Sequence, residues 1–248
     1  MKNKWFNEEV YLNGSYKLFC IPNAGSSIGM YSKWKKHINN GVEVHPLILP
    51  FRDGRRDESM PEKLQELARE FIVSNEKILR NNKCIYFGYC TGAVFAYEIA
   101  RQSMVLGFEP DAIITVNSQS PRFIVGEAKK LSHAKDKEIK MYLLGEGLVD
   151  KDVLEIPEFV EYYFPILRED FRIYSEYVSE NLQLNCPILN IYKHKSFKFP
   201  KENINDWKNY TKKYYEILIE ECKSLNPNDT KDLCELINKI ITKIRKEL

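Results

Sequence analysis

A cysteine between two glycines is the feature of this sequence best suited to chemistry. Cys90 follows an apolar run of strand character, residues 84–87, and stands between Gly88 and Gly92 in the segment GYCTG. Residues 93–99 then have the apolar character of a buried helix. A strand, a tight turn and a helix around one nucleophilic side chain form a nucleophile elbow, in which serine is the usual nucleophile. The pattern therefore predicts that Cys90 is a nucleophile.

The glycines support this interpretation on steric grounds. A nucleophile at such a turn is held in a strained backbone conformation, and a side chain at either flanking position would clash where the strand and helix approach each other. An alternative is that Cys90 is a buried small hydrophobe after a strand, which is the commoner state of a free cysteine.

The elements that must position Cys90 are those of a parallel sheet. Strand-like segments alternate with helical patterns, which predicts an α/β fold with a mostly parallel central sheet and helices on both faces. Pro46 indicates that the second strand is an edge strand or contains a bulge. We expect strands at residues 16–22, 42–49, 84–87, 112–116, 186–192 and 215–219, and helices at residues 30–38, 60–79, 93–99, 205–212 and 229–247.

Two other segments bear on the site. Residues 123–180 contain helical patterns without a convincing strand, so we predict a helical lid inserted into a single domain that spans residues 1–248. Residues 23–27, NAGSS, form a loop of small residues after the first strand. Such a loop lets backbone N–H groups point into a cleft, as an oxyanion hole requires, although it is also compatible with an ordinary strand-to-helix loop.

Composition excludes several classes of protein. The 248 residues carry a net charge of +2 from 37 basic and 35 acidic residues spread along the chain, which gives no nucleic-acid footprint. We find neither an apolar run of membrane-spanning length nor a signal-peptide pattern, so we expect a cytoplasmic protein without a membrane segment. The six cysteines and four histidines fall at no metal-ligand spacing, and we expect free thiols and no metal.

Taken together, these segments resemble those of a known family. The chain is similar to proteins of the α/β-hydrolase fold and, more closely, to the type II thioesterases that accompany nonribosomal peptide and polyketide synthases. The order of the matching segments is more specific than the pattern GxCxG alone. These segments are LFCIPNAGSS at 18–27, LPFRDGRR at 49–56, GYCTGAVFAYEIAR at 88–101, VNSQSPR at 116–122 and PILREDFRIYSEY at 165–177.

The resemblance implies an activity. Members of this family hydrolyse acyl groups from the phosphopantetheine arm of a carrier protein, without a cofactor of their own, and a monomer is their usual state. By resemblance, Cys90 would form the acyl-enzyme, the backbone N–H groups of Ala24 and Thr91 would stabilise the oxyanion, and the helical lid would shape the acyl pocket.

The resemblance also implies a docking surface for the carrier around the elbow and the lid. An acidic carrier would favour a basic patch such as Arg52, Arg55 and Arg56, although these arginines could instead fix the loop that contains them.

The sequence departs from the family at the two usual partners of the nucleophile. An acid normally follows the strand at residues 186–192, but here the loop reads KHKS and contains no carboxylate. A histidine normally follows the last strand, but here residues 220–224 read EECKS. His194 is the best candidate for a general base, and Cys222 lies at or next to the position of the missing histidine. His133 could swing inward from the lid.

Cysteine changes what can follow from an incomplete triad. A few per cent of a thiol is already ionised near neutral pH, and a helix N-terminus stabilises the thiolate further. Cys90 could therefore take an acyl group from a thioester without a strong base, whereas water needs one to release it. Three functions stay open: a thioesterase, an acyltransferase or cyclase that passes the acyl group to a nucleophile other than water, and a non-catalytic protein that binds a carrier or an acyl chain.

Overall fold

A parallel sheet forms the centre of the molecule. The computed structural model describes residues 3–13, 15–39, 41–145, 148–180, 182–193, 200–219 and 224–247. Within these ranges the sheet has six strands in the order β2-β1-β3-β4-β5-β6, and every neighbouring pair is parallel. The strands are β1 (Tyr16–Ile21), β2 (Val42–Pro46), β3 (Lys83–Tyr89), β4 (Ala112–Val116), β5 (Ile188–Lys193) and β6 (Tyr214–Ile219).

The central strands are apolar because the sheet is covered on both faces. All five residues of β4, AIITV, are buried, as expected for a strand inside a parallel sheet with helices on each side. At the edges the pattern weakens, and β6 keeps no buried residue. β2 forms the other edge and ends at Pro46, so the prediction of an edge strand is confirmed.

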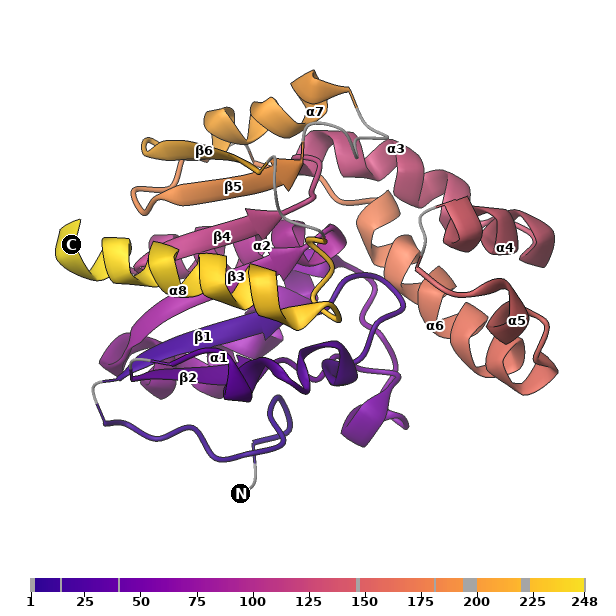
Figure 1. Ribbon diagram of the computed structural model, residues 1–248, viewed down its shortest axis with the longest axis horizontal. Coiled ribbons are helices and arrows are strands. Elements are labelled where there is room, and N and C mark those ends of the chain that lie inside the picture. The colour runs from indigo at the N-terminus through magenta and orange to yellow at the C-terminus, as the bar shows by residue number, and fades with distance from the viewer. Residues whose placement is uncertain are drawn as a thin grey trace.

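Helices form layers on both sides of this sheet. α1 and α2 pack on one face, and α8 crosses the other (Figure 1). One apolar cluster contains Phe71 of α1 and Val94 of α2, and a second cluster contains Ile237 of α8. The helices are α1 (Leu64–Asn81), α2 (Thr91–Val105), α3 (Pro121–Ser132), α4 (Asp136–Gly145), α5 (Lys151–Leu154), α6 (Pro157–Ser175), α7 (Lys201–Asn205) and α8 (Thr230–Glu247).

The helix predicted at residues 30–38 is wrong in detail. The chain forms two short 3₁₀ turns instead, η1 (Ile28–Tyr31) and η2 (Trp34–Lys36). Tertiary hydrogen bonds fix these turns: the Tyr31 hydroxyl donates to the Ile21 carbonyl at 2.8 Å, and the Trp34 indole N–H donates to the Pro227 carbonyl at 3.0 Å. Two further 3₁₀ turns are η3 (Asp53–Arg55) and η5 (Asp206–Tyr210).

The helices α3 to α6 occupy one end of the sheet. They lie beyond the carboxyl ends of the strands, where the arrowheads in Figure 1 point. The described residues of the predicted lid segment, 123–180, are helical or irregular and contain no strand, and α3 begins slightly earlier, at Pro121. Because Cys90 directly follows β3, the nucleophile and these helices are at the same edge.

Candidate active site

Cys90 lies at a sharp corner between β3 and α2. Its backbone has φ +50° and ψ −121°, which is an unfavourable region for a residue that carries a side chain. The neighbouring strand holds this geometry, because the Cys90 N–H donates to the Val116 carbonyl at the end of β4 at 2.9 Å. The side chain is partly exposed. The corner therefore presents an accessible thiol, whereas four other cysteines in the described ranges are buried.

The two flanking glycines leave no room for a side chain. A Cβ atom on Gly88 would lie 2.3 Å from the backbone nitrogen of Ala93, in the first turn of α2. A Cβ atom on Gly92 would lie 2.5 Å from the carbonyl oxygen of Ile21, at the end of β1. Backbone atoms cannot move aside as a flexible side chain can. The steric reason given for the glycines is therefore present in the structure.

Replacing Gly88 by alanine should destabilise the fold by about 3 kcal/mol, since the added methyl group overlaps backbone atoms of Gly92 and Ala93 in the first turn of α2. The matched control is Gly126→Ala in α3, where a Cβ atom meets nothing within 4 Å. That change should stabilise the protein by about 0.5–1 kcal/mol, because alanine suits a helix interior better than glycine. Urea unfolding measures both. Equal stability of the two variants would contradict the steric account.

The loop after β1 contains one of the two proposed oxyanion donors, Ala24, and both of its central N–H groups have acceptors within the protein. The Ala24 N–H donates to Thr91 Oγ1 at 2.7 Å, and the Gly25 N–H donates to Asp170 Oδ2 at 2.7 Å. Thr91, Asp170 and Ala24 are all buried. Ala24 and Thr91 are thus brought together beside Cys90, as their predicted roles require, with the Ala24 N–H engaged by a side chain.

Helix α6 supplies polar groups next to this loop. Asp170 and Tyr174 lie one turn apart on it, both almost fully buried, and Tyr174 lies close to the Thr91 side chain. Burial, followed by the charge of Asp170, raises the pKa of Tyr174 well above its ordinary value and that of Tyr163 to about 12. Both phenols therefore stay protonated at neutral pH and act as hydrogen-bonding groups rather than as bases.

The predicted basic docking patch is largely wrong. Arg52 is 1% exposed and forms an ion pair with Asp170, with Arg52 Nη1 donating to Asp170 Oδ2 at 2.7 Å. Arg55 is 2% exposed, donates to the Ile48 carbonyl and pairs with Glu58. Of the three arginines only Arg56 is exposed. The alternative given with that prediction, that the arginines fix their loop, applies to Arg52 and Arg55.

The predicted base candidates fall in two groups. His194 and Cys222 lie outside the described residues. His133 ends α3 and is exposed, with Nδ1 2.9 Å from the Ser132 hydroxyl. A further histidine, His45, is not one of these candidates: it lies in the edge strand β2, 3.2 Å from Glu43, and burial lowers its pKa, so it is a neutral side chain in the fold.

Two cavities differ in their relation to the site. One, of about 480 Å³, lies between the oxyanion loop and the helical segment and is lined in part by Ser26, Arg52, Phe159 and Tyr163. It adjoins the groups described above.

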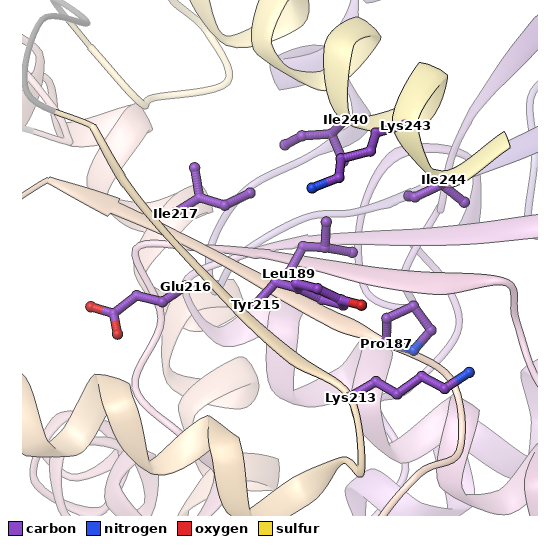
Figure 2. Close-up of a pocket in the computed structure, with 9 residues that line it drawn as sticks. All are labelled: Pro187, Leu189, Lys213, Tyr215, Glu216, Ile217, Ile240, Lys243 and Ile244. Carbon is purple, nitrogen blue, oxygen red and sulfur yellow. The ribbon is translucent and has the colours of Figure 1, made fainter. Parts of the chain in front are cut away.

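The other cavity, of about 260 Å³, lies between α8 and the sheet edge (Figure 2). Pro187, Leu189, Lys213 and Tyr215 line it from the amino ends of β5 and β6. Because Cys90 follows the carboxyl end of β3, this second cavity lies away from the nucleophile.

The strand order, the elbow and the position of the helices define the fold as that of an α/β hydrolase. The thioesterase-domain family model matches residues 16–243, and the chain belongs to this family. Within the described ranges, none of the helices combines the length and apolar character needed to cross a membrane.

Similar proteins include one from Aneurinibacillus migulanus and one from Streptomyces venezuelae. The gramicidin S biosynthesis protein GrsT of Aneurinibacillus migulanus is 25% identical over 221 residues, which cover 88% of this chain and 85% of GrsT. The thioesterase PikA5 of Streptomyces venezuelae is 23% identical over 201 residues, 80% of this chain and 71% of PikA5. Among solved structures, the type II thioesterase BorB of the borrelidin biosynthetic cluster superposes with a TM-score of 0.80 at 21% identity, covering 98% of each chain.

Two functional features could not be read from local sequence motifs alone. The ion pair between Arg52 and Asp170 joins residues 118 positions apart, and the contact between Ala24 and Thr91 joins residues 67 apart. One signal for the first did exist. Asp170 lies on the apolar face of α6, between the buried residues Leu167 and Tyr174, and a carboxylate at such a position usually has a buried partner.

Proposed function

We propose that this protein is a thioesterase that acts on acyl or peptidyl thioesters of a carrier protein in nonribosomal peptide or polyketide biosynthesis, through an acyl-enzyme on Cys90. The observation that carries the proposal is the partly exposed Cys90 thiol at a strained strand-to-helix corner, in a chain of the thioesterase-domain family. The roles of the similar proteins GrsT, PikA5 and BorB favour this biosynthetic setting.

The first half of the reaction suits this site. The Cys90 thiolate adds to the thioester carbonyl and forms a new C–S bond, while the carbonyl electron pair moves onto oxygen. The tetrahedral oxyanion is stabilised by the backbone N–H groups of Ala24 and Thr91. It collapses by expelling the phosphopantetheine thiolate, which takes a proton from solvent. One thioester replaces another, so the step needs no strong base.

The second half needs a group that removes a proton from water. Strand β5 ends at Lys193, at the same edge of the sheet as Cys90, and His194 is the next residue in the sequence. We therefore assign His194 as the candidate base, with Cys222, after β6, as the alternative position. Because no carboxylate stands in the sequence KHKS, release to water should be slow compared with acylation.

Intact-mass analysis after incubation with an acyl-pantetheine thioester tests the proposal. Catalytic release of the free acid supports a thioesterase. A stable adduct on Cys90 that is discharged only by an added amine or thiol would instead support an acyltransferase or cyclase. If no adduct forms although Cys90 still reacts with iodoacetamide, the protein would be one that binds a carrier or an acyl chain without catalysis.

A further inference from the structure

The Thr91 hydroxyl accepts a hydrogen bond from the Ala24 N–H, which the proposed reaction needs as an oxyanion donor. Thr91 is the first residue of α2 and is fully buried, and its Oγ1 accepts the Ala24 N–H at 2.7 Å. A backbone N–H makes one strong hydrogen bond at a time. In the free protein, therefore, the Ala24 N–H is engaged by a neighbouring side chain.

Helix α6 packs against this arrangement from the other side. Tyr174 is buried on this helix, close to the Thr91 side chain. One turn earlier on the same helix, Asp170 accepts the neighbouring Gly25 N–H at 2.7 Å. The two central N–H groups of the oxyanion loop are thus both satisfied, one by Thr91 of α2 and the other by Asp170 of α6.

We propose that the Thr91 hydroxyl is an internal occupant of the oxyanion hole, which the substrate oxyanion must displace from the Ala24 N–H. The inference rests on the proposed Cys90 acyl-enzyme. When Cys90 adds to the carbonyl, the new oxyanion takes the Ala24 N–H, and Thr91 Oγ1 turns away while its backbone N–H remains available as the second donor. Thr91 is then a positioning residue that sets how much of the oxyanion interaction reaches the transition state.

Removing the competing acceptor should make acylation faster. Valine has nearly the same shape as threonine but lacks the acceptor. In Thr91→Val the Ala24 N–H therefore has no side-chain acceptor in the free protein, whereas in the transition state it still binds the oxyanion. Because the oxyanion no longer has to displace a neutral hydrogen bond, the acylation rate should rise roughly five- to tenfold. Thr91→Ser keeps an acceptor and should lose most of this gain.

The experiment compares two reactions of Cys90 in single turnover by intact mass. Acylation by an acyl-pantetheine thioester requires an oxyanion hole, whereas alkylation by iodoacetamide does not. The ratio of the two rates should rise five- to tenfold in Thr91→Val and rise less in Tyr174→Phe, which removes a hydroxyl close to the Thr91 side chain but leaves the Thr91 acceptor in place. Thr115→Val is the matched control, since Thr115 is a buried threonine of β4 that bonds Asn190. It should leave the ratio unchanged.

A ratio that falls or stays the same in Thr91→Val would overturn the inference, because the hydroxyl would then assist the oxyanion or be irrelevant to it. Hydrogen exchange of the Ala24 amide gives a readout that does not depend on catalysis, and it should become at least about tenfold faster in Thr91→Val. If even the wild type forms no acyl adduct, the proposed acyl-enzyme fails. The exchange rate then decides the inference: faster exchange supports the contact, and unchanged exchange refutes it.

Discussion

Cys90→Ala should yield a folded protein that forms no covalent adduct with an acyl-pantetheine thioester and releases no free acid. The change removes the Cys90 sulfur at the corner between β3 and α2 and leaves the flanking glycines untouched. Intact mass after incubation reads the adduct, and thermal unfolding shows that the fold has survived. An adduct on the alanine variant would mean that another residue is the nucleophile.

Cys90→Ser separates the chemistry of the thiol from that of the site. A serine hydroxyl is not ionised near neutral pH and needs a base to become a nucleophile, whereas a thiol is partly ionised by itself. With an incomplete triad, the serine variant should acylate at least about a thousandfold more slowly than the wild type. A serine variant as active as the wild type would instead reveal a competent base.

His194→Ala belongs to the same comparison. If His194 is the base for water, its loss should slow release of the free acid while the adduct on Cys90 still forms. Equal rates of release from this variant and from the wild type would contradict the assignment.

The sequence was informative where local pattern determines structure. Continuous apolar runs predict the strands, since both faces of the sheet are covered, and the spacing of Gly88, Cys90 and Gly92 predicts the corner, since backbone sterics dictate it. Pro46 predicted the edge position of β2, because proline has no N–H to donate to a neighbouring strand.

The sequence was less informative where contacts between residues far apart in the chain determine the local structure. The segment after β1 forms two 3₁₀ turns because Tyr31 and Trp34 bind carbonyl groups elsewhere in the chain. Arg52 and Arg55 are charged residues of a kind common on protein surfaces, yet each is buried and donates hydrogen bonds to buried acceptors. Only the three-dimensional contacts distinguish a docking surface from a fixed loop.

Breaking the buried pair of Arg52 and Asp170 should have a large effect on stability. It joins three segments, because Arg52 also donates to the Ser26 and Pro50 carbonyls and Asp170 also accepts the Gly25 N–H. Asp170→Asn leaves the arginine charge buried without its counter-ion, which should cost about 3–5 kcal/mol in urea unfolding. Arg52→Met should cost a similar amount for the converse reason.

A double variant tests whether the two costs share one cause. Arg52→Met combined with Asp170→Asn removes both charges and keeps an acceptor for the Gly25 N–H, so it should lose clearly less than the sum of the single variants. Glu169→Gln is the control on the same helix: it breaks the half-exposed pair with Arg172 and should cost less than about 1 kcal/mol. Costs that simply add would show that the ion pair is not the interaction that fixes the oxyanion loop to α6, and the loop would then have to be held by the Ala24 contact with Thr91.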